Sequence, residues 1–143
     1  MRASLLALLA LAPLAGAARA EAPARVLALV TSPEAQVQGM ALVLLNQMRQ
    51  QGVTVEVVLC GAAADLARRE PPGAAAPALR PMGATPAQML RNLVQAGVRT
   101  EVCALYLPNA GVGAEALIEG VRPTAPPEMA RRMLAADTRV LPF

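Results

Sequence analysis

The chain of 143 residues has no histidine, lysine or tryptophan, and it contains one tyrosine and one phenylalanine. Histidine is the usual base beside a catalytic thiol, so its absence argues against a papain-like hydrolase. Without histidine, the two cysteines and the scattered methionines could suit only a soft metal ion such as Cu(I). With few aromatic residues and no arginine cluster larger than a pair, we expect no nucleic-acid partner.

Glycine-rich phosphate motifs are also missing. The sequence contains neither Gly-x-Gly-x-x-Gly nor a P-loop, and these are the usual signatures of dinucleotide and nucleotide sites. We therefore expect no cofactor and no resident metal.

The first twenty residues have every component of a secretory signal peptide. Arg2 precedes an apolar run at 5–11, and Ala18-Arg19-Ala20 is a small-x-small cleavage signal. The apolar run is shorter than the roughly 20 residues of a membrane span, although an uncleaved anchor is the alternative. We expect cleavage after Ala20 and a periplasmic or secreted protein without a membrane attachment. Removing residues 1–20 lowers the formal net charge from +3 to about +1.

Residues 21–143 suit one α/β domain, because strand and helix patterns alternate along them. Apolar, β-branched runs predict strands at 25–31, 53–59, around 103, at 120–123 and at 138–143. Helical patterns follow at 33–51, 61–69, 85–97, 114–118 and 127–135. Residues 70–83 are rich in proline and glycine and predict an extended loop.

Helix starts and faces can be predicted in more detail. Ser32 is the expected N-cap of the first helix, and Thr85 with Gln88 forms a capping-box pattern. Apolar residues at spacings of three and four predict the buried helix faces. The expected inward residues are Val37, Met40, Val43, Leu44 and Met48 in the first helix and Met129, Met133 and Leu134 in the last.

Five strands favour a flavodoxin-like three-layer sandwich with a mainly parallel sheet in the order 2-1-3-4-5. In such sheets ligands bind beyond the carboxyl ends of the strands, near the point where strand order reverses. The expected crevice is built from Thr31, Ser32, Cys60, Pro108 and Asn109, the last two in a turn after the third strand. This order separates the two cysteines by two strand spacings, so we expect no bond between Cys60 and Cys103 within one chain.

Cys103 is the main candidate for chemistry, because few other reactive side chains exist. It lies inside a short predicted strand just below the crevice. A free cysteine is also one of the most buried residue types, so Cys103 and Cys60 could both be small core residues. A reactive role would need a thiolate stabilised by arginine or by helix N–H groups.

Several of these segments together resemble the DsrE/DsrF-like sulfur-relay family, which includes YchN-like proteins. They are the opening strand with its Ser-Pro-Glu helix start, Cys60-Gly61, the motif Gly97-Val98-x-x-x-Val102-Cys103, and Gly120-Val121. The resemblance covers about residues 24–143. It implies a flavodoxin-like fold and homo-oligomers, as dimers, trimers or hexamers. In the sulfur-transferring members, the cysteine matching Cys103 carries sulfur as a persulfide.

Three functions therefore stay open. The protein could be a sulfur carrier that exchanges sulfane sulfur with an exported donor or acceptor protein through Cys103. It could be a non-catalytic oligomeric module in which Cys103 is a core residue. A third alternative is a soft-metal chaperone that uses Cys60, Cys103 and a methionine.

Overall fold

The computed structural model describes residues 25–73 and 76–143, and the expected signal peptide lies outside them. No helix in these residues is long and apolar enough to cross a membrane. The elements, in chain order, are β1 (Arg25–Val30), α1 (Ala35–Gln50), β2 (Thr54–Leu59), the 3-10 helix η1 (Gly61–Ala67), α2 (Pro86–Gln95), β3 (Arg99–Cys103), α3 (Tyr106–Ala110), the 3-10 helix η2 (Ala114–Ala116), β4 (Val121–Thr124), α4 (Pro126–Met133) and β5 (Thr138–Pro142).

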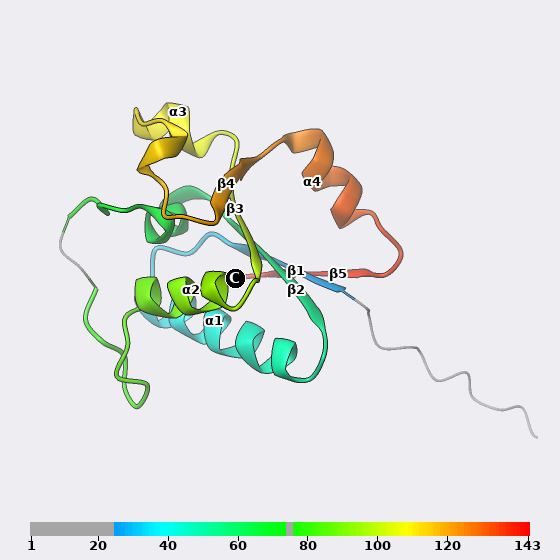
Figure 1. Ribbon diagram of the computed structural model, residues 1–143, viewed down its shortest axis with the longest axis horizontal. Coiled ribbons are helices and arrows are strands. Elements are labelled where there is room, and N and C mark those ends of the chain that lie inside the picture. The colour runs from blue at the N-terminus through cyan, green and yellow to red at the C-terminus, as the bar shows by residue number, and fades with distance from the viewer. Residues whose placement is uncertain (1–24, 74–75) are drawn as a thin grey trace, which may run out of the picture.

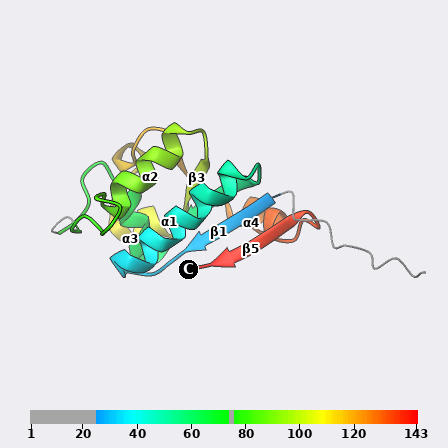
Figure 2. The same ribbon diagram turned by 90° about the horizontal axis from the view of Figure 1, so that it is seen from below.

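The five strands form one parallel sheet flanked by helices (Figures 1 and 2), which confirms the predicted α/β class. The order is 4-3-2-1-5, so β2 lies between β1 and β3 instead of at the edge where the order 2-1-3-4-5 would place it. The sequence contains a signal for this position. β2 is buried over five of its six residues, on both of its faces, as suits a central strand.

The connections explain which helices lie on which face. The chain steps in one direction from β1 to β4 and then crosses back to place β5 beside β1. A right-handed crossover places its helix on one face of the sheet when the chain steps in one direction along the sheet. It places the helix on the opposite face when the chain steps back. Accordingly, α1 and α2 lie together on one side of the sheet and α4 on the other (Figure 1).

The face under α1, α2 and η1 is the apolar core. Alternate residues of the central strands, including Val30, Val57 and Val102, are almost fully buried there. They pack against Leu45 of α1 and Leu90 of α2. This face follows the period-two alternation expected of a strand.

The predicted inner face of α1 is partly wrong: Val43 and Met48 pack against the core, whereas the other three residues do not. Val37, Met40 and Leu44 are exposed, and Met40 is 58% accessible. The buried positions are Gln38, Gly39, Ala41, Leu42 and Leu45. The helix carries two apolar stripes, and the one with small residues lies inward because it allows close approach. A Cβ on Gly39 would overlap the Leu79 side chain.

The predicted N-cap of the first helix, Ser32, is also wrong, because the N-cap position is occupied by Glu34. α1 begins after Glu34, which makes no side-chain capping bond, and Ser32 Oγ accepts a hydrogen bond from the Glu34 N–H outside the helix. The capping box of α2 is confirmed, with Thr85 and Gln88 bonded reciprocally.

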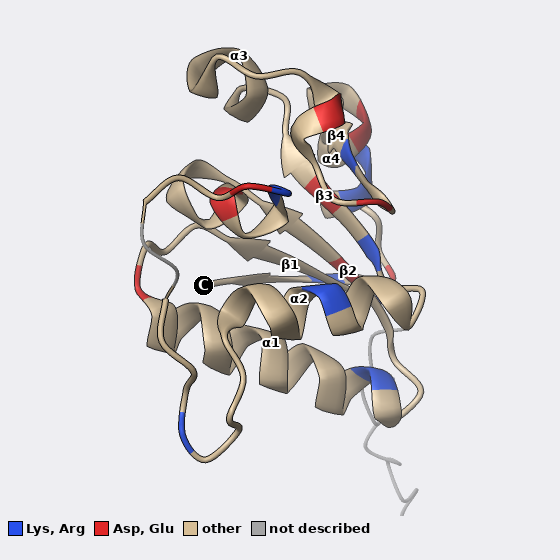
Figure 3. Ribbon diagram, turned by 60° about the vertical axis from the view of Figure 1, so that its left-hand side comes forward, with Lys and Arg blue, Asp and Glu red and all other residues tan. Residues whose placement is uncertain are grey.

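The second face of the sheet is held to α4 by charged groups. In Figure 3, basic and acidic residues gather around β3, β4 and α4, while α1 and α2 are mostly uncharged. The expected inward residues of α4 are wrong in two cases, since Met133 and Leu134 are exposed. Arg132 is buried in their place and contacts carboxylates of β2 and β3.

Candidate functional site

Cys60 and Cys103 are joined by a disulfide at the carboxyl edge of the sheet. Cys60 directly follows β2 and Cys103 ends β3, and these neighbouring parallel strands are in register at Leu59 and Val102. The two Cα atoms lie 5.1 Å apart, inside the range that a disulfide requires. The expectation of unpaired cysteines is therefore wrong. It depended on a strand order that placed β1 between them.

The backbone on each side positions the two sulfurs. The Cys60 N–H donates to the Val30 carbonyl at 2.9 Å, which extends the β1–β2 pairing by one residue. The chain then turns at Gly61, whose φ of +56° is a conformation that side chains disfavour. After Cys103 the chain forms the short helix α3, where the sequence predicted a Pro-Asn turn.

A pocket of about 500 Å³ opens over the disulfide. Both cysteines lie in its wall and are partly exposed. The rest of the wall consists of uncharged residues: Gly61, Leu105, Tyr106, Asn109 and Ala110. Neither cysteine belongs to the buried apolar cluster. The disulfide is thus accessible from solvent through a mostly apolar opening.

The structure brings together some of the predicted crevice residues and separates others. Cys60, Cys103 and Asn109 line the pocket, whereas Thr31, Ser32 and Pro108 do not. Thr31 is turned toward β5, where its hydroxyl donates to the Phe143 carbonyl at 3.1 Å. The Ser32 carbonyl accepts a hydrogen bond from the Gln38 side chain at 2.8 Å. The reversal of strand order lies between β1 and β5, away from the cysteines.

Tyr106 and Asp65 were not predicted as site residues. The Tyr106 hydroxyl donates to Asp65 Oδ1 at 2.5 Å and so connects α3 to η1 across the pocket wall. Burial, and then the Asp65 carboxylate, raise the pKa of Tyr106 to about 12. Tyr106 therefore stays protonated near neutral pH and acts as a hydrogen-bond donor that fixes α3. The sequence feature that could have indicated Tyr106 as a site residue is that it is the one tyrosine of the chain.

The asparagine of the pocket is also occupied within the protein. Asn109 Nδ2 donates to the Leu105 carbonyl at 2.7 Å. In this arrangement the reactive group in the pocket wall is the disulfide itself, with Cys60 and Cys103 as its two ends.

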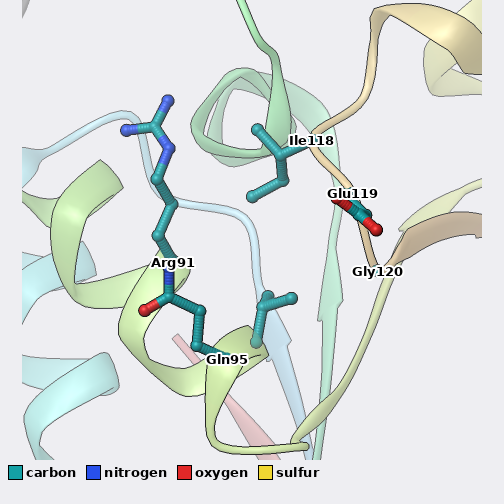
Figure 4. Close-up of a pocket in the computed structure, with 6 residues that line it drawn as sticks. Arg91, Gln95, Ile118, Glu119 and Gly120 are labelled. Carbon is teal, nitrogen blue, oxygen red and sulfur yellow. The ribbon is translucent and has the colours of Figure 1, made fainter.

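A second hollow, of about 370 Å³, lies between the end of α2 and the segment before β4. Figure 4 shows Arg91 and Gln95 on one side and Ile118, Glu119 and Gly120 on the other. It contains no nucleophile, so we assign no chemistry to it. Within residues 25–73 and 76–143, no three His, Cys, Asp or Glu side chains are grouped to hold a metal ion.

The comparisons with known proteins agree with this fold. The chain is similar to MTH1491, a protein of unknown function from Methanobacterium thermoautotrophicum, with 19% identity and a TM-score of 0.59. It is also similar to the ychN protein from E. coli, with 22% identity and a TM-score of 0.62. Each alignment covers 83% of this chain and 98% of the other. At these identities the likeness concerns the fold.

No curated protein gives a significant match. The profile of the DsrE/DsrF-like family matches residues 24–143, which include every described element and both cysteines. The chain therefore belongs to the DsrE/DsrF-like family.

Proposed function

We propose that this protein is an exported sulfur carrier in which Cys103 receives a sulfane sulfur atom as a persulfide and passes it to an acceptor protein. Membership of a family linked to sulfur relay supports the proposal. The observation that carries it is the position of Cys103, which lies in the wall of an open pocket and outside the buried core. A core residue would have no such access.

The loading step uses the reduced protein. The Cys103 thiolate attacks the outer sulfur of a donor persulfide R–S–SH, which gives Cys103–S–SH and releases R–S⁻. Delivery is the same reaction in reverse toward an acceptor thiolate. In the oxidised form, the disulfide with Cys60 would protect Cys103 from irreversible oxidation in an oxidising compartment. A dithiol reductant would open this disulfide before loading: it gives two electrons to the Cys60 and Cys103 sulfurs and is itself oxidised to a disulfide.

The test is intact-mass spectrometry of the reduced protein after incubation with glutathione persulfide. We expect an added mass of one sulfur atom on the wild type and on Cys60→Ser, and none on Cys103→Ser. The two variants are matched, because each retains one thiol. An unmodified wild type, or equal loading of Cys103→Ser, would contradict the proposal.

We propose a second function in assembly, in which α1 binds α1 of another copy of this chain. Val37, Met40 and Leu44 form an exposed apolar stripe on this helix. The helix carries a single charged residue, Arg49, near its end. A neutral, apolar helix face can pack against its own copy without repulsion between like charges, and it gains free energy by removing apolar area from water.

Self-association is tested by light scattering coupled to size-exclusion chromatography. We expect a wild-type mass that is a small multiple of the monomer mass, and a monomer for Met40→Glu, because a charge would be buried in the contact. Gln50→Glu is the control, since it adds the same charge at an exposed position on another side of α1. A monomeric wild type, or an oligomer unaffected by Met40→Glu, would exclude α1 as the contact.

A further inference from the structure

The disulfide of the pocket is an oxidant as well as a protecting bond. It joins two partly exposed cysteines that lie in the wall of an open volume of about 500 Å³. Exposed disulfides are generally the labile ones, because a nucleophile can reach the sulfur atoms. A small thiol or hydrosulfide entering the pocket therefore meets a bond that it can open.

We propose that the oxidised protein takes hydrosulfide as its substrate and converts it to protein-bound sulfane sulfur. HS⁻ attacks Cys103 Sγ, a new sulfur–sulfur bond forms, and the Cys60–Cys103 bond breaks. The products are Cys103–S–SH and the Cys60 thiolate. The hydrosulfide sulfur is oxidised, and the electron pair of the broken bond leaves with Cys60. The choice of Cys103 as the carrier rests on the proposed function.

The reaction balances without another reagent. One HS⁻ and one disulfide give one persulfide and one thiolate, with the proton and the single negative charge conserved. The oxidant is the disulfide that the structure contains. In this scheme Cys60 is the leaving group, which gives the second cysteine a role that sulfane transfer alone does not require.

The pocket wall favours hydrosulfide over larger biological thiols. Apart from the cysteines, its residues are Gly61, Leu105, Tyr106, Asn109 and Ala110, and none is charged. The Asn109 amide is bonded to the Leu105 carbonyl, and the Tyr106 hydroxyl to Asp65. Glutathione brings two carboxylates, for which this wall offers no cationic partner. Hydrosulfide is also an anion, but it carries no carboxylate, so the missing cationic partner disfavours glutathione more than it disfavours hydrosulfide.

The experiment exposes the oxidised wild type to one equivalent of fresh sodium sulfide without oxygen, then traps all thiols and persulfides with iodoacetamide. We expect the mass of one sulfur atom plus two alkyl groups, with the sulfur on the Cys103 peptide and the second alkyl group on Cys60. Glutathione at the same concentration should open fewer molecules. A protein that stays unalkylated, or that gains two alkyl groups without sulfur, would overturn the inference.

The single-cysteine variant Cys60→Ser separates this inference from the proposed function. It has no disulfide, so sulfide should add no sulfur to it, although glutathione persulfide should still load its Cys103. Equal sulfur uptake from sulfide by Cys60→Ser and the wild type would overturn the role of the disulfide. Failure of persulfide loading, together with normal opening by sulfide, would instead count against the sulfane donor step alone.

Discussion

Arg132 shows how much one residue contributes to the second face of the sheet. Its guanidinium is buried and donates to Glu56 Oε2 at 2.6 Å, to Glu101 and to Thr124 Oγ1 at 3.0 Å. Burial opposes ionisation of Glu101, but the hydrogen bonds from Arg99, Arg132 and Arg122, together with the charge of Arg132, outweigh it and lower the pKa of this carboxyl. Arg132 therefore joins α4 to β2 and β3 through ion pairs and to β4 through a hydrogen bond.

We expect Arg132→Met to lower the free energy of unfolding by about 3–5 kcal/mol, because two buried carboxylates lose a cationic partner. Denaturant unfolding at neutral pH measures this change. Arg131→Met is the control, since Arg131 is the exposed neighbour on the same helix and its loss should change stability by about 0.5 kcal/mol or less. Equal effects of the two substitutions would mean that the buried ion pairs do not hold α4.

The difference in the free energy of unfolding between the wild type and Arg132→Met also depends on pH. A carboxyl whose pKa is lowered by folding stabilises the protein above its unfolded pKa, and this stabilisation is lost as pH falls through the folded value. For Glu101 the gap in stability between wild type and Arg132→Met should therefore narrow in acid.

The burial of Arg132 could not be predicted from the periodicity of apolar residues in α4. The spacing of Met129, Met133 and Leu134 favoured an apolar inner face, whereas Glu56 and Glu101 determine the face that is buried. Acidic residues inside two strand segments, Glu56 and Glu101, were a visible signal. Connecting them with Arg132 required the knowledge that β2 and β3 are neighbours.

At the scale of elements, hydrogen bonds between residues close in sequence were predicted more reliably than the buried face of a helix. The Thr85–Gln88 box starts α2 as predicted, because its hydrogen bonds depend on four consecutive residues. The rotation of α1 depends on what surrounds the helix, and α1 has apolar residues on two stripes. Small residues at 39 and 41 decide between them, since they allow the closest packing.

We expect Thr85→Ala to lower the stability of the protein by about 1 kcal/mol, because the Gln88 N–H loses its acceptor at the start of α2. Thermal and denaturant unfolding would both detect this. Ser32→Ala is a matched comparison, since Ser32 Oγ accepts from Glu34 before α1 begins and does not cap the helix. If Ser32→Ala costs as much as Thr85→Ala, the capping box is not the source of the effect.

At the scale of the whole molecule, the α/β class and the parallel sheet followed from the alternation of elements, and the strand order did not. The orders 2-1-3-4-5 and 4-3-2-1-5 use the same elements and the same handed crossovers. They differ in whether β2 or β1 is the neighbour of β3, which depends on long-range packing. That one difference decided the candidate site, because it determines whether Cys60 and Cys103 can meet.

The disulfide also changes how the polypeptide is connected. It closes a ring that contains η1, the loop before α2, α2 and β3, and the two cysteines have a sequence separation of 43. A protease that cuts once inside this ring leaves a single covalent molecule, whereas a cut before Cys60 or after Cys103 releases a separate fragment. When the disulfide is opened, the same nicked ring becomes two chains. Protein that is nicked inside the ring would therefore migrate as one band while the Cys60–Cys103 disulfide is intact, and as two bands once it is opened.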